Sequence, residues 1–269
     1  MKVSVITVCY NALEDLKKTV ESVLAQSYRD MEYIVVDGGS KDGTIDYLTA
    51  VRPRFEARNL SLRWISEADR GVYNAMNKGI EMASGVFINY MNAGDGFYSD
   101  FSLELFFAHQ IDPMAGVLYG DTCQIFDFGS GIAKREDYLK DNSIMPFCHQ
   151  SSFVKTELMK KYRFDESYRI IADHDLFYRM HVDGVVFQYI EEVIANYNGQ
   201  YGLSANNPLQ LRLEGLRVHH VNEKWYYPFA VVKTYLRYGW IARFKRIMPS
   251  AISDAWMRYK RRRYIDKER

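Results

Sequence analysis

The stretch Val35-Val36-Asp37-Gly38-Gly39-Ser40-Lys41-Asp42-Gly43-Thr44 decides the fold of this chain. The apolar run that begins at Tyr33 predicts a buried strand that ends at Asp37. Two glycines then turn the chain, and Ser40 or Asp42 can cap the helix that follows. A carboxylate at the end of a strand, beside backbone that glycine leaves free, suits recognition of a nucleotide base or ribose in an open α/β sheet.

Strand and helix patterns alternate through the first third of the chain. β-Branched and apolar runs predict strands over residues 3–9, 33–37, 60–66 and 86–91. The spacing of apolar residues predicts helices after a start signature at Asn11 and Glu14, over 44–51 and over 72–83. This order predicts a Rossmann-like α/β fold, in which helices flank a mainly parallel central sheet and ligands bind at the carboxyl ends of the strands.

The pattern after Asp95 is mixed. It predicts helices over 102–109, 155–162 and 173–182, and strands over 117–128, as a pair or as one bent strand, and over 185–190. We expect a turn at Gly129-Ser130-Gly131 and a polar loop over 201–207. Residues 1–207 are therefore expected to form the α/β domain, and residues 208–269 a helical basic C-terminal extension.

Charge is unevenly spread along the 269 residues, although the formal net charge is only +1. Residues 233–269 hold 12 Lys and Arg against 3 Asp and Glu, whereas residues 1–232 hold 23 against 31. An acidic body with a basic tail is typical of a protein that meets an anionic membrane surface or nucleic acid. We do not expect nucleic acid as a partner, because no segment matches a known nucleic-acid-binding module.

The basic tail also carries an imperfect amphipathic pattern over residues 231–263. One predicted helical face holds Val231, Val232, Tyr235, Leu236 and Trp240. Aromatic anchors beside basic side chains are typical of docking on an anionic lipid surface. A basic helix that packs on the acidic body of the same chain is the alternative.

Cysteine usage and hydropathy indicate the compartment. Cys9, Cys123 and Cys148 lie far apart and are odd in number, which argues against a disulfide framework and a zinc site and indicates a reducing environment. No apolar run reaches eighteen residues, and the run from Val3 to Tyr10 is too short for a membrane span. We therefore expect a cytoplasmic protein that does not cross a bilayer.

Three acidic stations close three successive predicted strands. Asp37 ends the second strand, Asp69 follows the third and Asp95 follows the fourth. Because parallel strands end at one edge of a sheet, these carboxylates are expected to surround one cleft. Such a cluster is costly unless the groups bind a ligand or a hard divalent cation with oxygen ligands. The alternative is that each carboxylate caps a helix or holds a turn.

Two phosphate-binding motifs are absent. GxGxxG does not follow the first strand, where residues 9–12 read Cys-Tyr-Asn-Ala, and GxxxxGK[ST] does not occur. A nicotinamide dehydrogenase and a P-loop enzyme are therefore disfavoured. If the chain binds a diphosphate, a metal ion must neutralise most of its charge.

Four segments together resemble family 2 of the inverting nucleotide-sugar glycosyltransferases, which have the GT-A fold. They are residues 5–11 (VITVCYN), 37–44 (DGGSKDGT), 66–79 (SEADRGVYNAMNKG) and 91–95 (MNAGD). The resemblance is dense through residue 95, continues in patches to about residue 205 and fades in the tail. It implies a nucleotide-sugar-binding half over 1–98 and an acceptor half over 99–207.

The resemblance also implies roles on the donor side. The residues expected to hold the nucleotide sugar are Thr7, Asn11, Asp37, Asp69, Asn77, Lys78 and Asn92. Asp95 resembles the metal-binding aspartate of the family, with Mg²⁺ or Mn²⁺ as the expected cofactor. The chain departs from the usual form at Gly94, where relatives usually carry a second carboxylate.

On the acceptor side, Asp173 matches the catalytic base of the family and Asp175 its common companion. A general base that takes the acceptor proton is worth about 10²–10⁴-fold in rate. His149 and Gln150 match a pair expected to line the acceptor or diphosphate region, and residues 202–204 match a mobile loop. From the residues alone, Asp173 could instead cap a helix, and His149 could be a buried hydrogen-bonding histidine.

These features predict an inverting glycosyltransferase that moves a sugar from a nucleoside diphosphate sugar, a UDP-sugar, to a hydroxyl of a glycan or lipid-linked glycan. The resemblance implies a role in bacterial cell-surface polysaccharide biosynthesis, and the basic tail indicates a location at the inner face of the cell membrane. The alternative is a nucleotide-sugar-binding or membrane scaffold protein without transfer activity. A nucleotidyltransferase is disfavoured, because residues 9–13 lack the glycine- and arginine-rich loop that it requires.

Overall fold

The computed structural model describes residues 1–126, 129–134, 147–198 and 207–239. Within them one sheet holds nine strands: β1 (Val3–Cys9), β2 (Met31–Asp37), β3 (Ser61–Ser66), β4 (Phe87–Tyr90), β5 (Gly96–Phe97), β6 (Ala115–Phe126), β7 (Gly129–Ala133), β8 (Ser152–Lys155) and β9 (Val186–Asn198). Their order is β3-β2-β1-β4-β8-β6-β9-β5, with β7 paired to β6. The pairings make β3, β2, β1, β4, β6 and β9 run in one direction and β5, β7 and β8 in the other. The prediction of an α/β fold around a mainly parallel sheet is confirmed.

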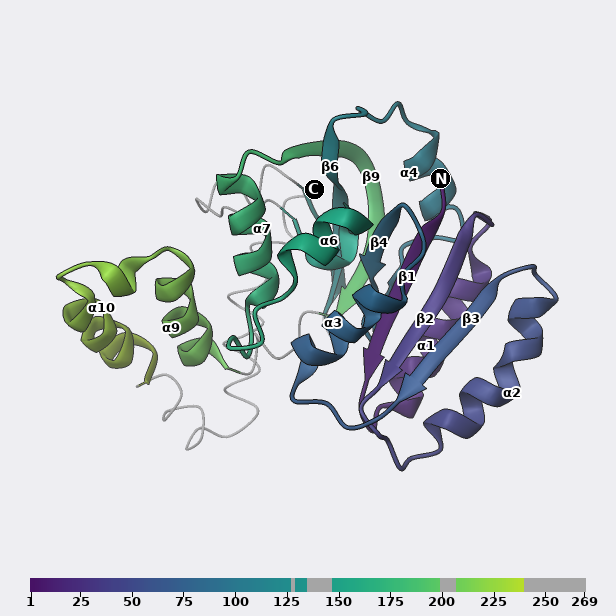
Figure 1. Cartoon of the computed structure of the whole chain (residues 1–269), viewed down its shortest axis with the longest axis horizontal. Helices are drawn as coiled ribbons and strands as arrows, with labels where there is room; N and C mark the ends of the chain where they lie inside the picture. Colours follow the sequence, from purple (N-terminus) through teal and green to yellow (C-terminus); the bar gives the residue numbers. More distant parts are fainter. Residues whose placement is uncertain (127–128, 135–146, 199–206, 240–269) are drawn as a thin grey trace.

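Helices cover both faces of this sheet (Figure 1). The longer ones are α1 (Leu13–Ala25), α2 (Thr44–Glu56), α3 (Val72–Met82), α4 (Ser102–Ala108), α6 (Thr156–Tyr162), α7 (Ala172–Val182), α9 (Pro208–Val218) and α10 (Tyr227–Thr234). The short ones are η1 (His149–Ser151), η2 (Val221–Glu223) and η3 (Tyr235–Gly239). Apolar residues of α1, α2 and α4 share one core cluster, and those of α3, α6 and α7 share the other.

The period of two along β1 explains why both faces are covered. Val3 and Val5 belong to the core beneath α1, whereas Ile6 and Val8 belong to the core beneath α3. All seven residues of β1 are buried. A strand that is apolar on both faces requires helices on both sides, which places β1 in the interior of the sheet.

The helix starts differ from the expected capping. Asn11 is not an N-cap, because α1 begins at Leu13 and the Asn11 backbone has a φ of 47°. Asp42 lies at the starts of both α1 and α2, where its carboxylate accepts the N–H of Leu13 at 2.9 Å and that of Thr44 at 3.3 Å. Ser40 instead accepts the Asn11 N–H at 2.7 Å.

Two predictions in the second half need correction. Gly129-Ser130-Gly131 is not a turn but the start of β7, where these residues pair with Phe126, Ile125 and Gln124. β9 extends to Asn198, eight residues beyond its predicted end at 190, because pairing with β6 across register shifts includes the polar residues at its end. The predicted loop at 202–204 and the bases at 258–263 lie outside the described residues.

At the C-terminal end of the described chain, α9 packs against α7, and α10 and η3 extend from α9 to one side of the molecule (Figure 1). Across the described ranges, no helix combines the length and apolar character needed to span a bilayer.

A buried carboxylate joins β1, β2 and β3 at the end opposite the strand C-termini. The Glu32 side chain is 2% exposed. It accepts hydrogen bonds from Ser4 Oγ at 2.6 Å, the Ser84 N–H at 2.7 Å and the Arg63 guanidinium at 2.8 Å. Burial opposes its ionisation, but the Ser4, Ser84 and Arg63 contacts outweigh that effect and lower the pKa of Glu32 to about 2.

We predict that Glu32→Gln lowers the free energy of unfolding by about 2–3 kcal/mol at pH 7. Because the folded-state pKa is depressed, the stabilisation is present above pH 4.5 and is lost as the pH falls toward 2. Urea unfolding of both proteins at several pH values measures this difference. The control is Glu21→Gln in the exposed Glu21–Arg54 ion pair, which should cost less than about 1 kcal/mol. A loss for Glu32→Gln that stays constant between pH 7 and pH 3 contradicts the prediction.

Candidate functional site

A cavity of about 700 Å³ opens at the carboxyl ends of the parallel strands. Its walls come from the ends of β1 and β4, the starts of α1 and α3, and the segment through η1. Five of the residues predicted from sequence line it: Asn92, Asp95, His149, Gln150 and Asp173. An open α/β sheet places its ligand site at this edge, so the cavity is the candidate functional site.

Two consecutive residues of η1 bind two carboxylates that line the cavity, Asp173 and Asp95. His149 Nδ1 lies 3.0 Å from Asp173 Oδ2, and Gln150 Nε2 donates to Asp95 Oδ2 at 2.9 Å. On its other side, His149 Nε2 lies 3.2 Å from Asn92 Nδ2. Because the Asn92 amide nitrogen can only donate, Nε2 is the acceptor in this contact, and Nδ1 carries the ring proton that is donated to Asp173. The structure thus connects residues predicted for the metal, donor and acceptor sides.

The Asp173 carboxylate is held in its ionised form. Burial opposes ionisation, but the His149 hydrogen bond and the His174 N–H at 2.9 Å outweigh it and lower the pKa of Asp173 below its usual range. Asp173 is not the N-cap of α7, because the helix begins at Ala172 and Ile171 occupies the cap position. The side chain remains 19% exposed, so it can meet a ligand in the cavity.

The residues near Asp95 form a small set of oxygen donors. Asp95 is 8% exposed and lines the cavity beside Asn92, whose buried Oδ1 has no hydrogen-bond partner. No group of three or more His, Cys, Asp or Glu side chains in the described ranges could hold a metal ion by itself. One carboxylate and one amide oxygen nevertheless fit a hard divalent cation that takes its other ligands from water and a diphosphate.

Two predicted donor residues, Thr7 and Asp37, are fully buried. Thr7 Oγ1 donates to the Met91 carbonyl at 2.6 Å, which joins β1 to the end of β4. Asp37 accepts the Ser40 N–H at 2.9 Å and the Ser66 hydroxyl at 2.6 Å, and it also binds the Ser40 hydroxyl. These contacts shape the Gly-Gly-Ser turn that follows β2.

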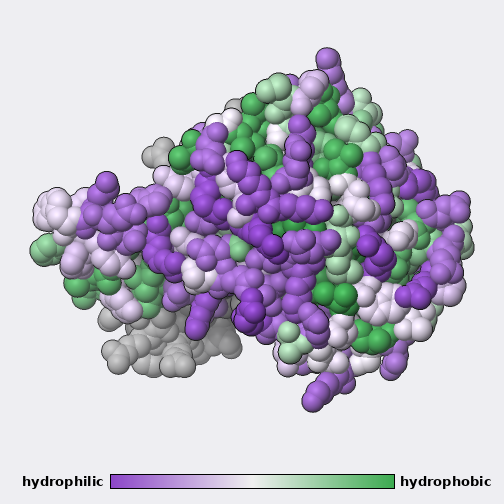
Figure 2. All heavy atoms as spheres, viewed as in Figure 1, coloured by the Kyte–Doolittle hydropathy of each residue, from purple (hydrophilic) through white to green (hydrophobic). Residues whose placement is uncertain are grey.

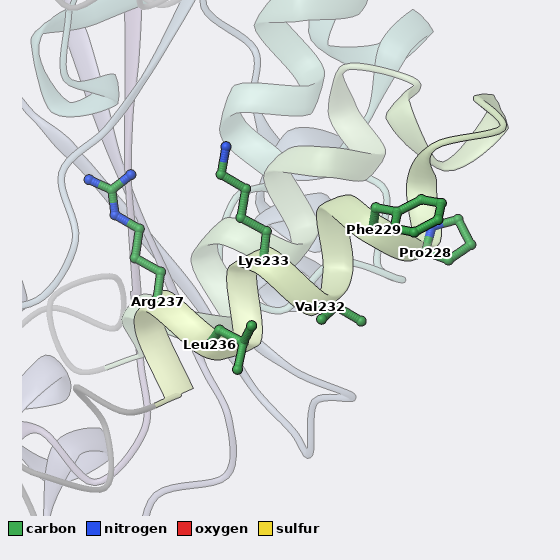
Figure 3. A pocket seen from close by; sticks show the side chains of 6 residues that line it. All are labelled: Pro228, Phe229, Val232, Lys233, Leu236 and Arg237. Atoms are coloured by element: carbon green, nitrogen blue, oxygen red, sulfur yellow. The ribbon is translucent and has the colours of Figure 1, made fainter.

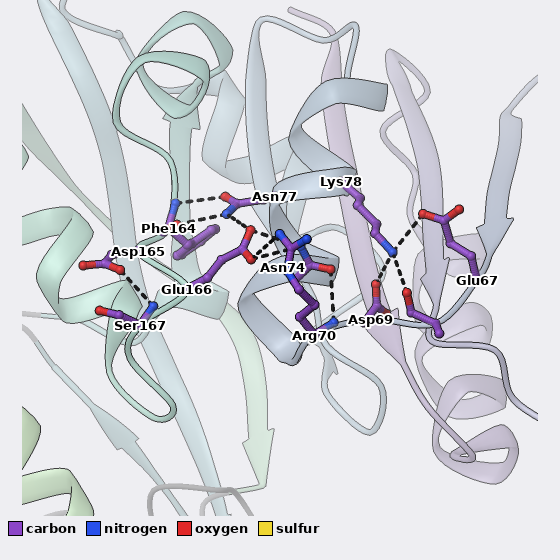
Figure 4. Close-up of polar contacts among 11 residues, drawn as sticks. Glu67, Asp69, Arg70, Asn74, Asn77, Lys78, Phe164, Asp165, Glu166 and Ser167 are labelled. Carbon is purple, nitrogen blue, oxygen red and sulfur yellow. Dashed lines mark hydrogen bonds and ion pairs between the residues drawn. The ribbon is translucent and has the colours of Figure 1, made fainter.

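The predicted Asp69, Asn77 and Lys78 lie in a polar cluster beside the cavity, shown in Figure 4. Lys78 pairs with Asp69 and with Glu67, whose carboxylate is 2.9 Å away. Asn77 is buried and exchanges two hydrogen bonds with the backbone of Phe164, at 2.9 and 3.0 Å. Asn77 therefore fixes the loop before α7.

Glu166 is the centre of the other half of this cluster (Figure 4). It accepts hydrogen bonds from Arg70 at 2.8 Å, Asn74 at 3.0 Å and Asn77 at 3.1 Å. These contacts, with Arg70 the strongest, lower the pKa of Glu166 to about 2. Sequence reasoning missed Glu166, because a lone glutamate in a loop gives no signal of its distant partners.

The remaining predicted residues do not line the cavity. Asn11 is exposed, and its side-chain oxygen accepts the Lys41 N–H at 2.9 Å. Asp175 pairs with Arg179 one turn later at 2.8 Å, which indicates a structural role inside α7. Of the three carboxylates expected around one cleft, the structure brings Asp95 to the cavity, whereas Asp37 and Asp69 lie next to it with protein partners of their own.

The sequence also gave no role to several side chains that line the cavity. They are Tyr10, Lys18, Phe147 and Tyr197. Tyr10 follows directly on β1 and is 66% exposed. An aromatic residue at the end of a predicted strand could have indicated that it lines the cavity. Lys18 lies on α1, where Asp15 is 2.8 Å away.

We predict that His149→Ala raises the pKa of Asp173, because the substitution removes a hydrogen bond that favours the carboxylate. The titration of ¹³C-labelled aspartate carboxyl groups measures this pKa directly. His181→Ala serves as the control, since His181 is exposed near the other end of α7. An Asp173 titration that is the same in both variants would contradict the proposed contact.

Comparison with known proteins agrees with this geometry. The profile of Glycosyl transferase family 2 matches residues 4–192. An uncharacterised glycosyltransferase of Mycobacterium tuberculosis (strain H37Rv) is 33% identical over 191 residues, which cover 66% of this chain and 68% of the relative. A PGL/p-HBAD biosynthesis glycosyltransferase of Mycobacterium bovis (strain BCG / Pasteur) is 30% identical over 208 residues, which cover 75% and 78% of the two chains.

Solved structures show the same fold at low sequence identity. The mannosyltransferase PcManGT from Pyrobaculum calidifontis, in complex with GDP-Man and Mn²⁺, matches with a TM-score of 0.62 and 18% identity over 87% of this chain and 69% of its own. S. aureus TarS 1–349 matches with a TM-score of 0.61 and 15% identity over 91% and 74%. The architecture is therefore the GT-A fold. Because the family profile matches most of this chain, the chain belongs to glycosyl transferase family 2.

Proposed function

We propose that the protein is an inverting glycosyltransferase that moves a sugar from a nucleoside diphosphate sugar to a hydroxyl group of a glycan or lipid-linked glycan. The observation that carries this proposal is the placement of Asp173 and Asp95 in one cavity, each bound by one residue of η1. A direct displacement needs a base on the acceptor side and charge neutralisation at the leaving diphosphate. The two carboxylates meet these two needs.

Asp173 is the proposed general base. Its lowered pKa keeps it ionised at neutral pH, and the His149 contact to Oδ2 fixes its orientation. The acceptor oxygen attacks the anomeric carbon as its proton passes to Asp173. The bond from that carbon to the diphosphate breaks, and the electron pair leaves with the nucleoside diphosphate. Base assistance of this kind contributes about 10²–10⁴-fold to the rate.

Asp95 and the unpartnered Asn92 Oδ1 are the proposed protein ligands of Mg²⁺ or Mn²⁺. When bound, such an ion would neutralise charge on the leaving diphosphate as a Lewis acid. The Mn²⁺ in the PcManGT complex supports the use of a divalent metal by this fold. Gln150 orients the Asp95 carboxylate through Oδ2.

For the nucleotide we propose a site at the ends of β1, β2 and β3. Thr7, Asp37 and Asn77 shape it through their buried contacts, while Asn11, Asp69 and Lys78 lie at its rim. Gly38 lets the backbone after β2 lie close to the Asp69 side chain, because a Cβ at this position would lie 3.1 Å from Asp69 Oδ2. We propose UDP as the nucleotide, supported by the TarS complexes with UDP-GlcNAc and UDP.

The acceptor is proposed to be a glycan or lipid-linked glycan of a bacterial cell surface. The mycobacterial relative named for PGL/p-HBAD biosynthesis supports an acceptor of this kind. We propose that the enzyme works in the cytoplasm, docked on the inner face of the membrane through the region that begins at α10.

The described part of that region is an exposed apolar surface (Figure 3). Phe229, Val232 and Leu236 are 71%, 56% and 73% exposed, and Lys233 and Arg237 extend beside them. Figure 2 shows hydrophobic residues at this end of the molecule. Residues 227–239 contain no Asp or Glu. Apolar side chains beside bases fit an anionic lipid surface better than the acidic body of the chain, because the apolar groups would enter the interface.

We predict that Asp173→Asn loses at least about 100-fold in turnover yet still binds the donor nucleotide. Calorimetry with UDP and Mn²⁺ measures binding, and UDP release from a panel of UDP-sugars and glycan acceptors measures turnover, with EDTA abolishing it. Asp183→Asn, at the exposed end of α7, is the matched control. Undiminished turnover in Asp173→Asn would exclude it as the base. UDP binding without turnover in the wild-type protein would instead indicate a nucleotide-sugar-binding protein.

We predict that the full chain binds vesicles that contain phosphatidylglycerol more tightly than vesicles of phosphatidylcholine alone. Lys233→Gln with Arg237→Gln should weaken binding by about 30-fold, since each base near an anionic surface contributes about 1 kcal/mol. Phe229→Ser with Leu236→Ser should also weaken it, whereas Phe101→Ser, exposed next to α4, should not. Co-sedimentation measures the bound fraction. Equal binding by the wild type and both double variants would overturn the docking proposal.

A further inference from the structure

A buried carboxylate outside the family match contacts the segment that precedes Asp173. Glu214 lies on α9, beyond the matched residues 4–192, and is 2% exposed. Its oxygens accept the N–H groups of Arg169, Ile170 and Ile171 at 2.9, 3.0 and 3.2 Å. Gln210, one turn earlier on α9, donates to the same carboxylate at 2.9 Å. The main partners of this buried charge are thus three consecutive backbone amides.

These amides immediately precede α7, which begins at Ala172. Ile171 is the N-cap residue, and no side chain of its own caps the helix. N–H groups at a helix start need acceptors, and a negative charge there is also favoured by the helix dipole. Glu214, on a different helix, supplies both the acceptor oxygens and the negative charge. Asp173 follows two residues after Ile171, so the position of its backbone depends on this contact.

The same segment is held from its other side by Tyr73 of α3. The Tyr73 hydroxyl donates to the Ile170 carbonyl at 2.5 Å, and both residues line the cavity. The two contacts clamp residues 169–171 between α3 and α9. Glu214 does not line the cavity, so it can influence a reaction there only through the segment that it holds.

We propose that Glu214 is a positioning residue for Asp173, a role that rests on the proposed function of Asp173 as the base. Glu214 fixes the first turn of α7 so that the Asp173 carboxylate keeps its distance to His149 and to the acceptor hydroxyl. A displacement of about 1 Å in a reacting group can cost about 10²-fold in rate. The C-terminal extension is therefore part of the catalytic architecture, although it lies outside the family match.

The test is Glu214→Gln, which keeps the side-chain size and one acceptor oxygen. We expect kcat to fall by about 10- to 100-fold, while the Kd for UDP with Mn²⁺ changes by less than about twofold. Glu223→Gln is the matched control, because Glu223 is 63% exposed in the same region and pairs with His220. An unchanged kcat in Glu214→Gln, with only a lower melting temperature, would overturn the proposal.

The double variant Asp173→Asn/Glu214→Gln shows whether Glu214 acts through the base. We expect it to be no slower than Asp173→Asn alone, because a positioning effect disappears with the group that is positioned. Multiplicative losses would place the effect of Glu214 elsewhere and overturn the proposal. Full turnover in Asp173→Asn alone would show that Asp173 is not the base. That outcome contradicts the proposed function and is distinguished from a failure of the proposal on Glu214. If Glu214→Gln does not fold, Gln210→Ala, which removes only a side-chain donor to Glu214, must show the same selective loss of kcat.

Discussion

The hydrogen bond between His149 and Asp173 is the contact on which the candidate site depends. It sets the orientation of one carboxylate, and the next residue, Gln150, sets that of Asp95. The backbone of η1 is itself held by β4, because Asn89 donates to the Gln150 carbonyl at 2.8 Å. The insertion of β8 between β4 and β6 therefore places η1, which precedes β8, against β4.

Buried carboxylates recur at the junctions of this fold, and each accepts hydrogen bonds from backbone N–H groups. Asp37 holds the turn after β2, Glu32 ties the opposite ends of β1, β2 and β3, and Glu214 holds the start of α7. An unpaired charge in such positions would be costly, whereas amide and hydroxyl donors make it a rigid anchor. The acidic character of the chain body thus serves architecture as well as the cavity.

Local patterns predicted the first half of the fold well, because its parallel strands are apolar on both faces and its helices carry regular apolar spacing. The family resemblance also identified five of the residues that line the cavity. Three errors share one cause. Each of these boundaries is set by hydrogen-bonding partners outside the segment itself. Asp42 holds the start of α1, and pairing with β6 decides both the strand at 129–131 and the end of β9.

The sequence by itself determined that an α/β sheet would place Asp95 at the carboxyl edge of its strands, since strand periodicity and the motifs at strand ends are local properties. The resemblance to family 2 then added Asp173 to the expected site. Only the tertiary structure decided which groups bind these two carboxylates. His149 reaches Asp173 across 24 residues, Gln150 reaches Asp95 across 55, and Glu214 reaches Ile170 across 44. It also decided that Asp37 is buried beneath the cavity edge rather than exposed in it. The physical reason is that a hydrogen bond depends on distance and direction in space, which packing fixes and local sequence does not.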